Sequence, residues 1–229
     1  MEKEREDLKA AFKAGYRIDL PESADTLTKE MVVYYGRSSF NGRVAIPEGV
    51  RRIDNGCFFQ WPIRVVSLPK SLREIGTDAF AGCQLKELRV EGDGGKISLD
   101  AGAFEVNPEL RAVTLGNCKL SDSVFWGCPV RRITLTSECV PSKNDNTFGF
   151  GGCWNLHSDN FFGTVRDKYG GALGTYILKG RLVRVNYKPE PDKDFPGCAE
   201  NCIYERCYTL AGFGGNTGKM PVYEWEKVE

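Results

Sequence analysis

The residues best suited to chemistry are three cysteines near the end of the sequence. Cys198, Cys202 and Cys207 are close together, and His157 or Cys153 could complete a tetrahedral zinc site with them. Their spacings differ from the C-x-x-C pairs of structural zinc sites, and the sequence contains no C-x-x-C motif at all. We therefore predict no metal site and no cofactor, with one local disulfide or free thiols as the alternative for this segment.

Motifs that would indicate catalysis are missing from the sequence. Residues 214–219 resemble a phosphate-binding loop, but Phe213 occupies the first glycine position and Met220 replaces the Ser or Thr that would bind a metal. His157 is the single histidine and belongs to no recognisable motif. We predict that the protein is not an enzyme.

Composition restricts the classes of partner. Lys plus Arg and Asp plus Glu each total 31, so the formal net charge is zero, and no general attraction to nucleic acid or anionic membrane is expected. Hydrophobic residues make up 41% and charged residues 27%, as in globular proteins, and no apolar run reaches the length of about 18 residues that a membrane span needs. The nine cysteines are an odd number, so at least one thiol has no partner within the chain.

An internal repeat organises the sequence before the C-terminal cysteine segment. Residues 46–54 (IPEGVRRID) align with residues 68–76 (LPKSLREIG), with every apolar position and the proline in common. The same register places one phenylalanine in each unit: Phe58, Phe80, Phe104, Phe125 and Phe150. Such regular self-similarity is typical of solenoid architectures.

Each unit also contains a segment with apolar residues at its first, fourth and sixth places. This pattern predicts a strand buried on one side, and it occurs at Ile63–Leu68, Leu85–Val90, Leu110–Leu115 and Val130–Leu135. A unit of about 23 residues cannot bury this face alone, so the copies must stack. The stretch that ends in each phenylalanine is expected to form the opposite wall.

The consensus I-P-x-x-V-x-x-I-x-x-x-A-F-x-x-C-x-x-L-x-x-V-x-L-P resembles the BspA-like, Treponema-type leucine-rich repeat over residues 41–160. The resemblance implies an α+β repeat fold: a right-handed leucine-rich-repeat solenoid with a parallel sheet. It also implies a binding role, often in adhesion at a bacterial surface, so that a surface or secreted location is expected. An intracellular one stays open because the sequence shows no signal peptide. Residues 91–96 are an insertion, and the repeat register is open after residue 139.

The solenoid needs caps at both ends. Residues 2–14 are expected to form a helix, and a hairpin is expected to turn at Lys179–Gly180. The predicted organisation has four parts: an N-terminal cap with first strands at 1–40, about five repeats of 21–25 residues at 41–162, a hairpin cap at 163–188, and an irregular Cys/Gly/Pro-rich tail at 189–229.

The other cysteines fit the repeat. Three cysteines each stand three positions after a phenylalanine of the repeat, and we expect them to be buried in the interior: Cys83, Cys128 and Cys153. We also expect Cys57 to be buried, at an interior position that has room only for a small side chain. Cys118 and Cys139 follow consecutive strands and are expected to be neighbours on one edge, as a disulfide in an oxidising compartment or as a free pair in a reducing one.

The second place of each strand segment carries a cation. We call these four residues the basic row: Arg64, Lys86, Arg111 and Arg131. Strands about 4.8 Å apart would align them into a ladder roughly 14 Å long. The ladder would suit an acidic protein segment or an anionic glycan; alternatively, the side chains only cover the sheet and are neutralised by Glu87 and Glu109.

We therefore predict a non-enzymatic, macromolecule-binding scaffold that uses its exposed sheet face, with Trp126 and Trp154 as further candidate contacts. The alternatives are a structural subunit that docks through residues 189–229, and a thiol or zinc protein centred on the C-terminal cysteines. The partner and the oligomeric state stay open.

Overall fold

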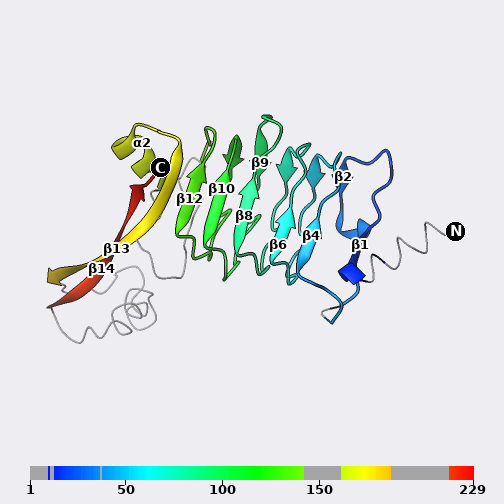
Figure 1. Ribbon diagram of the computed structural model, residues 1–229, viewed down its shortest axis with the longest axis horizontal. Coiled ribbons are helices and arrows are strands. Elements are labelled where there is room, and N and C mark those ends of the chain that lie inside the picture. The colour runs from blue at the N-terminus through cyan, green and yellow to red at the C-terminus, as the bar shows by residue number, and fades with distance from the viewer. Residues whose placement is uncertain (1–9, 11–12, 37, 142–160, 187–216) are drawn as a thin grey trace, which may run out of the picture.

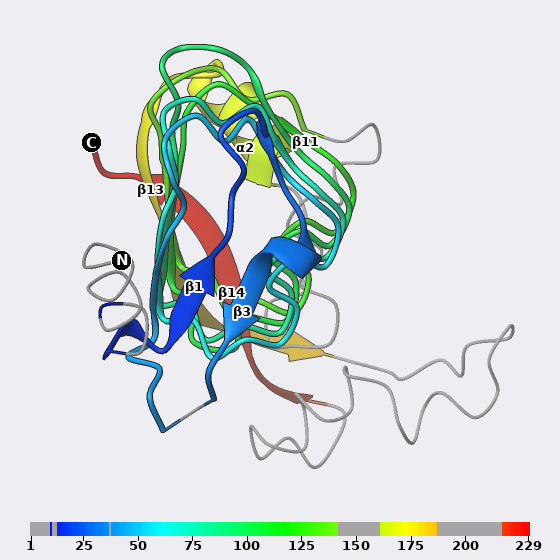
Figure 2. The same cartoon turned by 90° about the vertical axis from the view of Figure 1, so that its right-hand side faces the viewer.

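The computed structural model describes residues 10, 13–36, 38–141, 161–186 and 217–229, and shows an elongated solenoid. Successive coils stack along the long axis, and viewed along that axis they superimpose as a flattened tube with two walls (Figures 1 and 2). The predicted repeat solenoid with parallel strands is confirmed.

One wall, the long-strand face, contains the four predicted strand segments and one further strand, β4. It contains a parallel pair, β4 (Arg43–Ala45) and β6 (Val65–Ser67), followed by the parallel strands β8 (Glu87–Val90), β10 (Ala112–Leu115) and β12 (Arg132–Leu135). In β8, Leu88 and Val90 point into the core, while Glu87 and Arg89 are exposed. This alternation is the period-2 pattern expected of a half-buried strand.

The opposite wall, the short-strand face, is a second parallel sheet. Its members are β2 (Thr26–Leu27), β5 (Arg52–Ile53), β7 (Glu74–Ile75), β9 (Ile97–Leu99) and β11 (Cys118–Leu120), hydrogen-bonded in that order. The sequence analysis placed these stretches on the opposite wall, except β2, which lies in the segment predicted as the N-terminal cap. It did not reveal a sheet, because strands of two or three residues are too short to show alternation.

Stacked phenylalanines fill the space between the walls. Ring centroids are 5.0 Å apart for Phe58–Phe80, 5.3 Å for Phe80–Phe104 and 5.7 Å for Phe104–Phe125, with nearly parallel planes. All four side chains are completely buried. The repeat spacing therefore produces a continuous aromatic column of matching side chains.

An antiparallel pair closes the N-terminal end. β1 (Tyr16–Ile18) pairs with β3 (Val32–Tyr34), and the short 3-10 helix η1 (Lys29–Met31) precedes β3. Tyr16, Tyr34 and Phe40 pack edge to face in this cap. Of the helix predicted at 2–14, residues 10, 13 and 14 are described and are helical.

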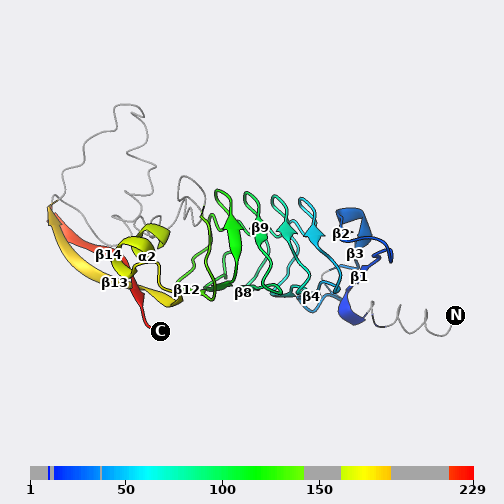
Figure 3. The same ribbon diagram turned by 90° about the horizontal axis from the view of Figure 1, so that it is seen from above.

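The C-terminal end is closed by a long hairpin whose predicted turn was wrong. β13 (Gly174–Asn186) passes straight through Lys179–Gly180 and pairs antiparallel with β14 (Thr217–Lys227), so part of the tail predicted as irregular is a strand (Figures 1 and 3). A distant partner strand outweighs the local turn preference of Lys-Gly. β13 also pairs with β12 and ends the stack of parallel strands.

An unpredicted helix, α2 (Phe161–Tyr169), packs on this cap. The Phe161 ring lies 4.9 Å from that of Trp225 in β14 and 5.5 Å from that of Tyr176 in β13. This aromatic cluster gives the final coil a hydrophobic cover.

Candidate binding surface

Three members of the basic row align on the long-strand face. Lys86, Arg111 and Arg131 immediately precede β8, β10 and β12, and all three are exposed. The Arg111 N–H donates to the Lys86 carbonyl (2.9 Å), and the Arg131 N–H donates to the Arg111 carbonyl (2.8 Å). Backbone pairing therefore holds the three cations in consecutive positions.

Arg64 occupies the same place before β6, but in a neighbouring sheet. Its N–H donates to the Gly42 carbonyl (2.7 Å), and β6 pairs with β4. A Cβ at Gly42 would lie 3.2 Å from the Arg64 side chain, so glycine gives this stem its space. Among the described strands, β6 and β8 are not hydrogen-bonded neighbours, so the ladder is interrupted between Arg64 and Lys86.

Acidic neighbours neutralise this row only in part. Lys86 Nζ lies 3.5 Å from Glu109 Oε2, and the two side chains are 65% and 50% exposed, respectively. Arg111 donates to the Pro108 carbonyl (2.9 Å) rather than to a carboxylate. Arg64 and Arg131 form no ion pair with any residue in the part of the chain that the structure describes.

Three further arginines on the same face were missed by the sequence analysis. Arg43, Arg89 and Arg132 lie within β4, β8 and β12 and are exposed; Arg43 and Arg89 each lie between two buried residues, and Arg132 precedes the buried Ile133. Of these, Arg89 forms an ion pair with Glu91. Period-2 alternation around each arginine was the signal that could have found them. We call the full set the basic face: Arg43, Arg64, Lys86, Arg89, Arg111, Arg131 and Arg132.

On the short-strand face, Arg52 is neutralised by neighbouring carboxylates. Arg52 on β5 forms ion pairs with Glu74 on the next strand and with Asp54, the latter at 3.3 Å. Both partners lie on the same wall, so the arginine is neutralised by its own sheet.

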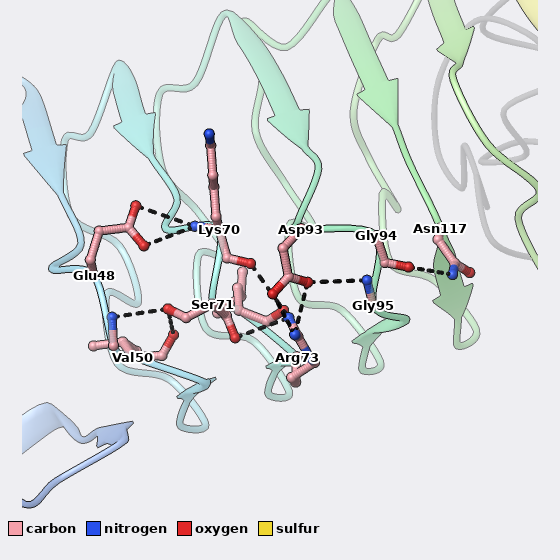
Figure 4. A network of polar contacts seen from close by, with 11 residues as sticks. Glu48, Val50, Lys70, Ser71, Arg73, Asp93, Gly94, Gly95 and Asn117 are labelled. Carbon is pink, nitrogen blue, oxygen red and sulfur yellow. Dashed lines mark hydrogen bonds and ion pairs between the residues drawn. The ribbon is translucent and has the colours of Figure 1, made fainter.

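Polar side chains and backbone groups in the turns between the two walls form a hydrogen-bonded network (Figure 4). Arg73 donates to both carboxylate oxygens of Asp93 at 2.8 Å and to the Leu72 carbonyl at 2.7 Å. The hydrogen bond from Arg73 lowers the pKa of Asp93 below its ordinary value. The Glu48 carboxylate accepts from the Lys70 N–H at 3.2 Å. These charged groups join the turns of adjacent coils, including the insertion at residues 91–96, and we assign them a structural role.

Three of the four repeat cysteines, Cys57, Cys83 and Cys128, are buried as predicted, and the fourth, Cys153, lies outside the described residues. Burial raises the pKa of Cys57, Cys83 and Cys128 to about 12, so their thiols are protonated and unreactive near neutral pH. Cys83 Sγ donates to the Phe58 carbonyl (3.4 Å), and Cys128 Sγ donates to the Phe104 carbonyl (3.1 Å). These three thiols are parts of the core.

The remaining predicted sites are placed as follows. Trp126 is 40% exposed and lies in the turn between β11 and β12, not in a strand of the basic face. Within the described residues no group of His, Cys, Asp and Glu could hold a metal ion. The zinc candidates lie outside those residues, as do Cys153 and Trp154; they are His157, Cys198, Cys202 and Cys207. Among the helices described, none is long and apolar enough to cross a membrane.

Comparison with protein families matches six copies of the BspA type leucine-rich repeat region over residues 31–165. Comparisons with curated proteins and with solved structures each gave no match. The matched region runs from the coil of β3 to that of β12 and ends within α2, and it covers more than half of the sequence. The chain therefore belongs to the BspA-type leucine-rich-repeat family.

Proposed function

We propose that this protein is a non-catalytic scaffold that binds an acidic segment of a protein partner across its basic face. Members of this repeat family typically serve as scaffolds for protein binding or adhesion. The proposal adds the surface and the chemistry of the partner. Solenoids present an extended surface formed by equivalent positions of successive coils, which suits the recognition of a segment rather than of a small molecule.

The observation that carries the proposal is the number of exposed cations on the long-strand face that have no carboxylate partner. Among the described residues only Lys86 and Arg89 of the seven-residue basic face form an ion pair, whereas the strands of the short-strand face carry two cations, of which Arg52 is paired with two carboxylates and Lys119 is unpaired. Unpaired cations on a sheet wall produce a local positive potential that the zero net charge does not reveal.

Each cation is expected to contribute little binding free energy, because the side chains of the basic face are exposed to solvent. A solvent-exposed ion pair contributes about 0.2–1 kcal/mol, so one arginine cannot hold a partner. Cations repeated about every 4.8 Å can engage several carboxylates of one segment together. Binding should therefore be moderate, distributed over the row and sensitive to salt.

We would test this with the double variant Arg111→Glu/Arg131→Glu. The matched control is Arg51→Glu/Lys119→Glu, which changes the net charge equally with exposed residues near the short-strand face. The probe is a fluorescein-labelled oligo-glutamate peptide, titrated by fluorescence anisotropy at low and at near-physiological salt, with folding of each variant checked by circular dichroism.

We expect the double variant to bind at least about tenfold more weakly, which corresponds to about 1.4 kcal/mol, and to show a flatter salt dependence, while the control stays within about twofold of wild type. Equal loss in the control would contradict a role for this face. If the wild-type protein does not bind the peptide but binds a sulfated oligosaccharide, the proposed acidic protein segment is wrong and the partner is an anionic glycan.

A further inference from the structure

Cys118 and Cys139 lie opposite each other at the last described step of the short-strand face. Lys119 forms a parallel bridge with Val140; the Val140 N–H donates to the Cys118 carbonyl and the Leu120 N–H to the Val140 carbonyl, each at 2.8 Å. The residue before each bridge partner is a cysteine. Neighbouring strands are about 4.8 Å apart, which lies inside the range of about 4.4–6.8 Å for the Cα atoms of a disulfide.

The two thiols point toward the same region of the core. Cys118 is completely buried, while Cys139 is half-buried, and Cys139 Sγ donates to the Gly116 carbonyl at 3.0 Å. A hydrogen bond between the two side chains lowers the pKa of Cys139 and raises that of Cys118. Cys139 is therefore the more accessible of the two thiols, and it has the larger thiolate fraction.

The other described thiols have no such neighbour. In the column that follows the phenylalanines, Cys83 and Cys128 are separated by Asn107, so these two sulfurs are about two strand spacings apart, beyond the reach of a disulfide. The position of Cys57 in the next coil is held by Ala79. Within the described residues, the parallel register brings only Cys118 and Cys139 together.

We propose that Cys118 and Cys139 are a redox modification site, closed to a disulfide by exchange with a low-molecular-weight disulfide of the glutathione type. The Cys139 thiolate attacks one sulfur of the small disulfide, whose S–S bond breaks as the first small thiolate leaves. Cys118 then attacks Cys139 Sγ in the mixed disulfide, and its proton goes to the second departing thiolate. Two protein thiols are oxidised and one small disulfide is reduced to two thiols; excess small thiol reverses the exchange.

The cross-link would join one coil of the solenoid to the next. It closes the loop from residue 118 to residue 139, which contains a complete repeat, and it ties the segment around Val140 to β11. Closing a loop of this length is expected to raise the Tm by roughly 6–12 °C in a chain of this size. The site is thus a device by which an oxidising environment would stabilise the C-terminal part of the stack.

The experiment uses the full chain in buffers that range from reduced to oxidised glutathione, followed by alkylation and non-reducing tryptic mapping. Trypsin cuts after Arg111, Lys119, Arg132 and Lys143, so the peptides 112–119 and 133–143 each contain a single cysteine. We expect the joined mass of these two peptides to increase with the oxidised fraction, to vanish with reductant, and to accompany the rise in Tm.

Cys139→Ser should lose both signals, whereas the control Cys57→Ala, which introduces the residue found at this position in the next coil, should keep them. If wild type under oxidised glutathione gives only unlinked peptides 112–119 and 133–143, with or without a glutathione adduct on Cys139, the proposal is wrong. The wild-type peptide map decides the question even if a variant fails to fold.

Discussion

Replacing Asn107 with alanine is expected to destabilise the core more than its polar side chain would suggest. Asn107 is completely buried in the column otherwise occupied by Cys83 and Cys128. Its Oδ1 accepts from the Leu85 N–H (3.2 Å), and its Nδ2 donates to the carbonyls of Phe80 (3.0 Å) and Phe104 (2.8 Å).

The magnitude follows from the groups left behind. Asn107→Ala removes the side-chain partner of the Leu85 N–H and of the Phe80 carbonyl, while the Phe104 carbonyl keeps its bond from Cys128 Sγ. Each of these two buried polar groups costs about 1–3 kcal/mol when left unsatisfied, so we expect a loss of about 2–6 kcal/mol in the free energy of unfolding. For a chain of this size that loss lowers the Tm by roughly 4–24 °C.

A conservative variant separates hydrogen bonding from volume. Asn107→Cys should be more stable than Asn107→Ala, because the thiols at this position in adjacent coils donate to the phenylalanine carbonyl of the preceding coil. The matched surface control is Asn117→Ala, which removes one exposed bond to the Gly94 carbonyl (3.2 Å) and should cost less than about 0.5 kcal/mol.

The assay is urea unfolding followed by tryptophan fluorescence and circular dichroism, with the free energy of unfolding compared at a common slope. An Asn107→Ala protein within 0.5 kcal/mol of wild type, on the order of a typical surface substitution, would refute the reasoning. Equal stability of Asn107→Ala and Asn107→Cys would also refute it, since the ranking rests on the recovered hydrogen bond.

Two smaller perturbations test the turns and the corner. Val106 has a φ of 52°, a left-handed conformation that Gly82 and Gly127 adopt at the same place in adjacent coils. Val106→Gly should therefore relieve backbone strain and raise the free energy of unfolding by about 0.5–1 kcal/mol, measured by urea titration. A decrease would contradict the assigned strain. Arg73 lowers the pKa of Asp93, so this carboxylate stabilises the fold above its unfolded pKa of about 3.9, and that contribution is lost as the pH falls through the lower folded value. The Tm difference between wild type and Asp93→Asn should therefore be full at neutral pH and shrink below about pH 4 in thermal scans; a difference independent of pH would exclude the ion pair as its source.

The elements set by local repetition could be predicted from the sequence. The phenylalanine column and the strands β6, β8, β10 and β12 follow from side chains that recur once per coil, and each is where the pattern indicated. The same alignment predicted the basic row and the neighbouring positions of Cys118 and Cys139.

The elements set by distant pairing could not be predicted in this way. β13 continues through Lys179–Gly180 because β14, far along the chain, offers it a full-length partner. The interruption between Arg64 and Lys86 likewise has no counterpart in the sequence pattern, since the repeat spacing continues across it. Both features depend on which strands meet, and repetition within each coil does not determine that.

The missing hydrogen-bond ladder between β6 and β8 has a mechanical meaning. At this coil boundary the short-strand face stays continuous through β7 and β9, while the long-strand face has no strand pairing. One backbone hydrogen bond, from the Gln84 N–H to the Ile63 carbonyl (2.9 Å), joins the two coils beside this gap, so this wall is expected to bend more easily here than between β8 and β12. The distance between Arg64 and Lys86 becomes the adjustable one, and the spacing from Lys86 to Arg131 stays fixed by the sheet.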